Sequence, residues 1–218
     1  WNIDSDNKTG VDWMMTSSHK VARCMSCESS CQWFPDNAVR SQYCGNASFA
    51  VWPGGNHFLQ IAVENKILQG NKNHLLRGFI FVDFSFCNLR VLADPQWIER
   101  LVRTNMNIVI ITDRKLEALA NYFFMQRSEI KGIIYSNDND IILKEKISHL
   151  FSGRRLNSRR GSMLNAVEFT LLNRFLSGAC LQEIIKSDGI DVKKIYVHKI
   201  RLERKLGISI HKILVSIL

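Results

Sequence analysis

Three groups of residues in this 218-residue chain have types and spacings that could do chemistry. The stretch KKIYVHKIRLERKLG (193–207) has six Lys or Arg residues among fifteen, mixed with apolar residues at helical spacing, as in helices that bind nucleic acid. Asp83 and Thr112 each lie near the end of an apolar run and could support phosphoryl transfer to an aspartate. Four cysteines could bind zinc: Cys24, Cys27, Cys31 and Cys44.

The Asp83 group lacks two parts that phosphoryl transfer needs. A magnesium site requires an acidic pair after the first strand, and the region FAVWPGGNHF (49–58) contains none. Ser136 stands where a lysine would pair with the phosphate. Without metal or counter-cation, the developing charge has no stabilising partner. We therefore expect no phosphorylation, with Asp83 only a polar residue near the end of a strand.

The cysteine group has the spacing CxxCxxxC, which lacks the paired CxxC…CxxC arrangement of common zinc sites. The sequence favours free thiols, with redox sensing as an alternative, and predicts no metal or other cofactor. Six cysteines clustered in this way are not a whole-chain disulfide framework, which predicts a reducing, cytoplasmic location. No catalytic triad is evident, so we do not expect an enzyme. No segment has the length and hydropathy of a membrane span or secretory signal.

Strands and helices are expected to alternate in the middle of the chain. Residues 1–50 are polar without a clear period, so we expect loops there. Three apolar β-rich runs predict buried strands, at 78–86, 107–113 and 130–136. Four helices are predicted, at 57–69, 94–104, 114–126 and 140–153. This order predicts a parallel sheet with right-handed crossovers, an open α/β domain of receiver-like size.

The last third predicts a separate all-α domain. Asn165 and Glu168 form a capping-box pattern before a helix that ends near Gly178. Three more short helices are expected, at 181–187, 192–206 and 210–218. Four short helices joined by tight turns are typical of a helix-turn-helix domain. Charge separates the two halves, because residues 151–218 hold 13 Lys or Arg against five Asp or Glu, whereas the first 150 residues are nearly neutral. A basic domain indicates a polyanionic partner.

The helix at 192–206 has two distinct faces. Ile195, Leu202 and Leu206 recur on one side, which predicts the core face, and His198 lies on that side as a packed or phosphate-contacting residue. Apolar and cationic residues are interleaved on the other side, as a major groove would accept. A merely solvated basic helix remains the alternative. The residues expected to bind DNA are Lys193, Lys194, Tyr196, Val197, His198, Lys199, Ile200, Arg201 and Arg204.

The segment LNAVEFTLLNRFLSGACLQEIIKSDGIDVKKIYVHKIRLERKLGI resembles the LuxR-type (NarL/FixJ) DNA-binding domain. The matching residues are Leu164, Glu168, Leu171, Leu172, Gly178, Glu183, Ile184, Ile190, Ile195, His198, Lys205 and Leu206. The resemblance implies that Tyr196 and Val197 face bases. It also implies that Lys194, Lys199, Arg201 and Arg204 lie on or near phosphates. Departures such as Asp188, in place of the usual Leu, affect the target sequence more than the fold.

Residues 78–156 are similar to the EcpR (MatA) type of enterobacterial regulator, with DRKLEALANYFF (113–124) the most distinctive block. This resemblance implies a pseudo-receiver joined to a LuxR-type helix-turn-helix, and control of a fimbrial (common-pilus) operon as its activator. The expected units are an irregular segment (1–50), a degenerate receiver-like α/β domain (51–153), a linker (154–162) and a helix-turn-helix DNA-binding domain (163–218).

The expected function is therefore sequence-specific binding to double-stranded promoter DNA, without phosphorelay. A homodimer is expected through an apolar face of the last helix, formed by Ile210, Ile213, Leu214 and Ile217. A hetero-oligomer with another regulator is also compatible with the sequence. The alternative function is a protein-interaction adaptor, in which the basic domain docks on an acidic partner.

Overall fold

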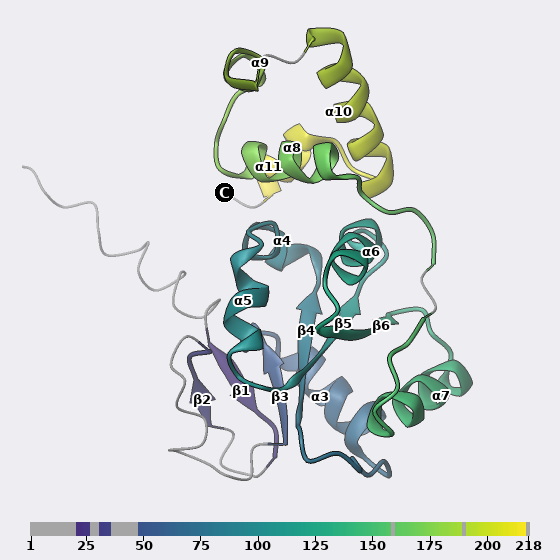
Figure 1. Cartoon of the computed structure of the whole chain (residues 1–218). Helices are drawn as coiled ribbons and strands as arrows, with labels where there is room; N and C mark the ends of the chain where they lie inside the picture. Colours follow the sequence, from purple (N-terminus) through teal and green to yellow (C-terminus); the bar gives the residue numbers. More distant parts are fainter. Residues whose placement is uncertain (1–20, 27–30, 36–47, 158–159, 189–190, 217–218) are drawn as a thin grey trace, which may run out of the picture.

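The computed structural model describes the chain except for residues 1–20, 27–30, 36–47, 158–159, 189–190 and 217–218. The described part forms an α/β domain followed by an all-α domain, which lies beyond one end of the sheet (Figure 1). This arrangement confirms the fold class predicted from the sequence.

The sheet has six strands in the order β2-β1-β3-β4-β5-β6. The three predicted parallel strands are confirmed as β4 (Phe79–Phe84), β5 (Asn107–Thr112) and β6 (Ile130–Tyr135). A fourth parallel strand, β3 (Phe49–Trp52), pairs with β4 and was not predicted. The prediction of loops throughout residues 1–50 is wrong, because β1 (Ala22–Cys24) and β2 (Gln32–Trp33) form an antiparallel extension on β3. Strands of two or three residues are too short to show a period of two, and the neighbouring strand stabilises them through its backbone.

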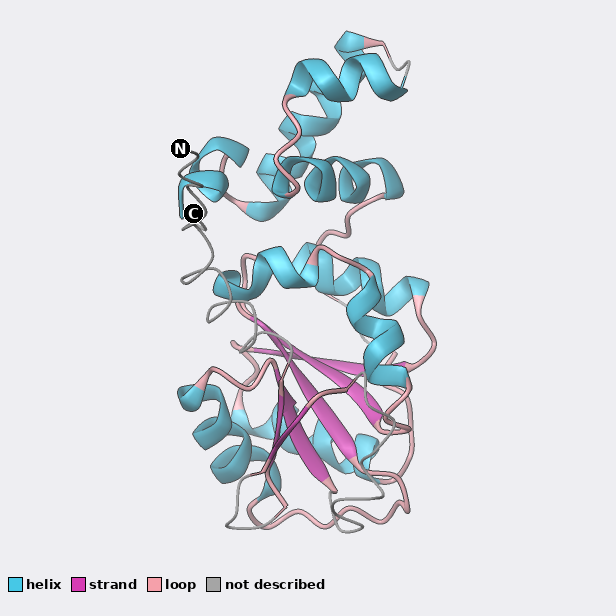
Figure 2. Cartoon of the chain, turned by 90° about the vertical axis from the view of Figure 1, so that its left-hand side faces the viewer, coloured by secondary structure: helices cyan, strands magenta, loops and turns pink. Residues whose placement is uncertain are grey.

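Helices cover both faces of the sheet (Figure 2). All four helices predicted for this domain are present: α3 (His57–Ala62) continuing as the π-helix η1 (Val63–Leu68), α5 (Gln96–Val102), α6 (Glu117–Gln126) and α7 (Asp140–Phe151). The 3₁₀ turn η2 (Phe86–Asn88) and the one-turn helix α4 (Leu89–Leu92) were not predicted. They are too short to display helical periodicity.

Side chains of β4 alternate between two cores, as expected for a strand buried on both faces. Ile80 and Val82 belong to a cluster with Trp97 of α5, and the same cluster includes α4 and α6. Phe79 and Phe81 belong to a second cluster, which includes η1 and α7.

The crossovers differ from the prediction that all are right-handed. The connections β3–β4 and β4–β5 step in the same direction along the sheet, yet η1 packs on one face and α5 on the other. Two such connections must have opposite hands, so one of them breaks the usual rule. The hairpin β1–β2 occupies the other side of β3, and the chain that leaves β3 therefore continues to β4.

The all-α domain contains the four predicted helices: α8 (Ala166–Leu176), α9 (Leu181–Asp188), α10 (Val192–Leu206) and α11 (Ile210–Ser216). The predicted capping box opens α8. The Asn165 side chain accepts a hydrogen bond from the Glu168 amide at 2.8 Å, and the Glu168 carboxylate accepts one from the Asn165 amide at 2.9 Å. These two hydrogen bonds between nearby residues therefore fix where α8 begins and the direction in which the chain enters it.

A continuous apolar core joins the two domains. Phe169 of α8 stacks on Tyr122 of α6, with ring centroids 4.6 Å apart, and meets Phe123 edge-on at 5.3 Å. The Asn173 side chain donates to the Ala93 carbonyl at 3.0 Å. Figure 1 shows α8 directly beside α4 and α6. The α/β domain therefore fixes the orientation of the helical domain in this conformation.

The segment expected to be a linker is attached to the α/β domain wherever it is described. Leu156 is buried in the core beside α7. The Arg155 guanidinium donates to the Ile130 and Phe124 carbonyls, at 3.1 and 2.7 Å. The Arg160 guanidinium pairs with Asp138, and its amide donates to the Tyr135 hydroxyl at 3.0 Å. These bonds hold the connection against the sheet.

Candidate nucleic-acid interface

Helix α10 is positioned by signals at both of its ends and by one buried seam. The Asp191 carboxylate accepts a hydrogen bond from the Lys193 amide at 3.1 Å, and Gly207 ends the helix with a φ of 66°. Only glycine adopts this left-handed conformation without strain. Ile195, Leu202 and Leu206 are buried in the core shared with α8, which confirms the predicted core face.

The face of α10 opposite this seam is exposed. With about 100° per residue, Lys193, Val197, Ile200 and Arg204 project to the side opposite the seam, and Tyr196 and Arg201 flank them. Tyr196, Val197 and Ile200 are 49%, 45% and 61% exposed. We call the exposed residues Lys193, Lys194, Tyr196, Val197, Ile200, Arg201 and Arg204 the outer stripe.

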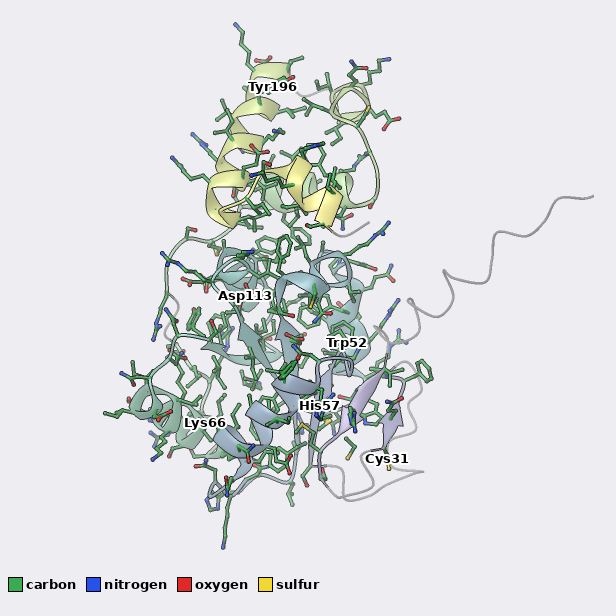
Figure 3. The ribbon with its side chains drawn as sticks, turned by 180° about the vertical axis from the view of Figure 1, so that it is seen from behind. Cys31, Trp52, His57, Lys66, Asp113 and Tyr196 are labelled. Carbon is green, nitrogen blue, oxygen red and sulfur yellow. The ribbon has the colours of Figure 1, made fainter. Side chains whose placement is uncertain are left out.

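The first turns of α10 lie far from the α/β domain, and its last turn comes close to α6 (Figure 1). Tyr196 lies near the end of the molecule that is farthest from the sheet (Figure 3). A group of large apolar side chains on one exposed face is unusual and often marks a binding surface. The stripe therefore combines apolar contact area with four exposed cations that form no ion pair with a described residue, and a DNA groove accepts both kinds of group.

Two of the nine expected DNA-binding residues are not in the outer stripe. Lys199 is half-buried and forms an ion pair with Glu203 at 2.8 Å. His198 is also half-buried, and its Nδ1 atom is buried with no hydrogen-bond partner among the described residues. The structure thus places both side chains at the border of the seam. For His198 this agrees with the predicted core face, whereas the resemblance to LuxR-type domains implied that Lys199 lies on or near phosphates.

Glu203 links α10 to the helix that follows. Its carboxylate also accepts a hydrogen bond from the Ile210 amide, at 2.9 Å, at the start of α11. Burial raises the pKa of Glu203, but the hydrogen bonds from Lys199 and from Ile210 outweigh it, and the pKa is lowered overall. Glu203 is therefore held ionised by the junction that it stabilises.

A buried ion pair joins the last turn of α10 to α8. Lys205 Nζ lies 2.6 Å from the Glu168 carboxylate, which is fully buried, and 2.8 Å from the Met163 carbonyl. Glu168 thereby serves both the capping box of α8 and the last turn of α10. The sequence indicated the capping role, but only the packing of the two helices shows the second.

The face of α11 that was expected to form a dimer is used inside the domain. Ile210 is 4% exposed and Ile213 is fully buried, both in the core around α8, so the prediction that they pair with a second copy is wrong. Leu214 is half-buried against the same core, and Ile217 lies outside the described residues. A helix of seven residues cannot cover its own domain and a partner with one apolar face.

The second predicted group surrounds Asp83, which is 3% exposed. Its Oδ2 accepts hydrogen bonds from the Asn56 and Asn88 side-chain amides, each at 2.9 Å, and its Oδ1 accepts one from the Ser85 amide at 3.1 Å. The Thr112 hydroxyl donates to the carbonyl of the next residue. Two neutral amides therefore satisfy a carboxylate that would otherwise attract a cation.

The cysteine group is only partly within the described chain. Cys24 on β1 is buried and Cys31 is exposed, and both are free thiols. Cys27 and Cys44 lie outside the described residues, so the choice between zinc and free thiols stays a prediction. Within the described ranges, no three His, Cys, Asp or Glu residues are grouped as a metal site. None of the described helices has the length and apolar character needed to cross a membrane.

Sequence reasoning missed the residues that hold the helical domain in place. Asp138 lies in a polar segment of the sequence, which is typical of a solvated carboxylate, but its side chain is almost completely buried between Lys146 and Arg160. Tyr122 and Asn173 also gave no signal, because aromatic and amide residues on a helix are common in any core or surface. Their role arises from contacts across more than forty residues of chain.

An α/β domain that carries a helix-turn-helix domain with an exposed basic helix defines the general class of this protein. Within that class, residues 23–151 match the family model described as "EcpR N-terminal domain". The chain is also 36% identical over 201 residues to "Uncharacterized protein YqeH" of Escherichia coli (strain K12), covering 92% of this chain and 96% of that one. The chain belongs to the EcpR family.

Solved structures of RcsB were also matched. They include "Structure of two RcsB dimers bound to two parallel DNAs", with 18% identity, a TM-score of 0.35 and coverage of 72% of this chain and 82% of that chain. A second is RcsB from Salmonella enterica serovar Typhimurium bound to promoter P1flhDC, with 19% identity, a TM-score of 0.31 and coverage of 72% and 79%. With scores this low, the fold assignment depends on the strands and helices described above.

Proposed function

We propose that this chain is a sequence-specific DNA-binding transcription regulator, with residues 163–218 as its DNA-binding domain. The outer stripe of α10 carries the proposal, because it is exposed and lies opposite the buried seam. In the proposed complex, α10 enters the major groove, where Val197 and Ile200 contact thymine methyl groups. Lys193, Lys194, Arg201 and Arg204 bind phosphates or guanine edges. Tyr196 faces bases, while His198 and Lys199 lie at the border of the groove.

The α/β domain is proposed to act without phosphorelay. Both oxygens of the buried Asp83 carboxylate already accept hydrogen bonds from neutral donors. Attack on a phosphoryl group would require Asp83 to lose these bonds and to gain a metal ion. The domain is instead a positioning element for the helical domain, through Phe169 and Asn173.

Membership of the EcpR family supports the proposal that the target is a fimbrial (pilus) operon, which the protein activates, and that the protein works in the cytoplasm as a homodimer or with another regulator. Since Ile210 and Ile213 are buried, the dimer contact must use a surface other than the apolar face of α11.

Selection of bound sequences from random duplex DNA with the full-length protein tests this function. We expect one enriched motif, a changed motif for Val197→Ala, and uniformly weaker binding for Arg201→Ala. Lys212→Ala, an exposed cation on α11, is the control and should change neither. Recovery of no enriched motif, together with binding to an acidic protein that depends on Arg201, would favour the adaptor alternative.

A further inference from the structure

The α/β domain contains a hollow of about 220 Å³ between η1 and α7. In the described chain, η1 and α7 are the helices of that face, and they leave part of β5 uncovered, where Ile111 is half-exposed. Most of the wall is apolar, formed by Leu59, Ala62, Val63, Ile67, Ile111, Ile134 and Leu143. The hollow lies near the carboxyl ends of β5 and β6, the edge at which open α/β sheets bind ligands.

A weak ion pair spans the mouth of this hollow. Lys66 Nζ on η1 lies 3.2 Å from Asp140 Oδ1 at the start of α7, and both side chains are more than half exposed. Figure 3 shows Lys66 between these two helices. Water screens an exposed pair of this kind and leaves it weak, so a ligand can replace one partner. Helix η1, which forms one wall, is a π-helix, and π-helical turns occur frequently at functional sites.

Lys66 is the cation among the described residues that line the hollow, and its exposed ion pair is the one that a ligand can open. Asp138, on the rim of the hollow, is the single carboxylate between two cations, Lys146 at 2.7 Å and Arg160. Glu117 also acts electrostatically on Tyr135, beside Arg160 and Asp138, so with the Lys66–Asp140 pair these six groups balance. Burial lowers the pKa of Lys146, the hydrogen bond and charge of Asp138 oppose this effect, and the charge of Arg160 adds to it.

We propose that this hollow binds a small amphipathic carboxylate as a regulatory ligand. The apolar chain of the ligand packs between η1 and α7, and its carboxylate replaces that of Asp140 as the partner of Lys66. Asp140 then remains stabilised in the first turn of α7, where the helix dipole favours negative charge.

The same wall reaches the connection to the helical domain. Tyr135 and Asp138 line the hollow, and both hold Arg160 through the hydrogen bond and ion pair described above. Asn121 accepts a hydrogen bond from the Tyr135 hydroxyl at 3.0 Å and donates to the Ser162 carbonyl at 2.8 Å. Occupancy of the hollow therefore alters how firmly residues 160–162 are held. This regulatory step depends on the proposed function, whereas ligand binding does not.

Isothermal titration calorimetry on the full-length protein without DNA tests the binding. The probes are butanoate, hexanoate and octanoate, with hexanol and hexylamine as uncharged and cationic controls. We expect saturable 1:1 binding of at least one carboxylate, and binding roughly tenfold or more weaker for hexanol, since a charge-assisted hydrogen bond contributes about 1.5–3 kcal/mol. No saturable binding of any carboxylate, or equal binding of hexylamine, overturns the proposal.

Matched variants locate the site. Ala62→Phe fills the hollow, whereas Ile61→Phe adds an aromatic ring at the neighbouring exposed position outside it. Lys66→Gln removes the cation at the mouth, whereas Lys144→Gln removes an exposed cation elsewhere on α7. We expect roughly tenfold weaker binding in the first member of each pair only. Equal losses in both members would place the carboxylate elsewhere.

Tryptic cleavage of the connecting segment 154–162 measures the regulatory step, again without DNA. We expect saturating carboxylate to change the cleavage rate in the wild-type protein and not in Ala62→Phe. Binding without any change in the cleavage rate would support the ligand site and refute its coupling to the helical domain. Because none of these measurements uses DNA, a failure here is distinct from a failure of the proposed DNA-binding function.

Discussion

The outer stripe predicts how strongly the affinity for DNA depends on salt. Each phosphate that a cation neutralises lowers the slope of log K against log salt by about 0.9. Four cations of the stripe are exposed and make no ion pair with a described residue: Lys193, Lys194, Arg201 and Arg204. The expected slope is therefore about −3.6 for one domain and about −7 for a dimer. Between 50 and 200 mM salt, a single domain should lose about 150-fold in affinity.

Arg201→Ala and Lys199→Ala test whether the salt dependence comes only from the unpaired cations of the stripe or equally from every basic residue of α10. Arg201 is free, so its removal should take away about a quarter of the slope, whether the protein binds as a monomer or a dimer. Lys199 is paired with Glu203, so its removal should leave the slope unchanged within about 0.3, a third of one phosphate contact. Fluorescence anisotropy of a labelled mixed-sequence duplex over a salt series measures both slopes.

The contrast between the two variants is what can refute this reasoning. Equal reductions of the slope for Lys199→Ala and Arg201→Ala would show that the ion pair with Glu203 does not hold Lys199 back from DNA. A slope near zero for the wild-type protein would show that the stripe does not face phosphates. Thermal denaturation of each variant establishes that the folded fraction is the same.

Three further predictions concern the supports of the site. Phe169→Ala should lower the free energy of unfolding by about 3 kcal/mol and loosen the contact between α8 and α6 at Tyr122. Thermal denaturation and a larger hydrodynamic radius measure the two effects, with Thr170→Ala at the exposed neighbouring position as control. An unchanged radius would show that this contact does not hold the two domains together. Since the pKa of Glu203 is lowered on folding, its contribution to stability is present above pH 4.5 and is lost as the pH falls through the folded-state pKa. The free energy of unfolding of Glu203→Gln should therefore fall less than that of the wild type as the pH is lowered through this range. The same pH dependence in both proteins would contradict the role of Glu203. Incubation with acetyl phosphate should add no phosphoryl mass, and an adduct that disappears in Asp83→Asn would overturn the assignment as a pseudo-receiver.

Much of the fold could be predicted because its signals are local. The strand at Phe79–Phe84 is apolar except for Asp83, and the capping box at Asn165 lies within four consecutive residues. The seam of α10 follows from helical periodicity alone, as does the exposure of Val197 and Ile200 on the opposite side. Such features depend on neighbours in the sequence, so no knowledge of the rest of the chain is needed.

Most predictions that the structure contradicts concern contacts between residues that lie far apart in the sequence. Strands β1 and β2 are stable because β3 lies beside them, and nothing in two or three residues encodes that neighbour. The apolar face of α11 was assigned to a partner molecule because the sequence cannot show that α8 already covers Ile210 and Ile213. Lys199 is an error of another kind: the family resemblance placed it near phosphates, although its i, i+4 spacing to Glu203 on a predicted helix already allowed the ion pair that the structure shows.

The sequence by itself determined the order of β4, β5, β6 and the longer helices, the basic character of the last third and the two-sided pattern of α10, since each depends on residue type and short-range spacing. Only the tertiary structure decided which cations are free, how α8 docks on α6, and that η1 and α7 leave a hollow beside Tyr135 and Asp138. Those properties depend on which distant surfaces meet, and the distances across which charges and apolar groups interact are set only when the chain has folded.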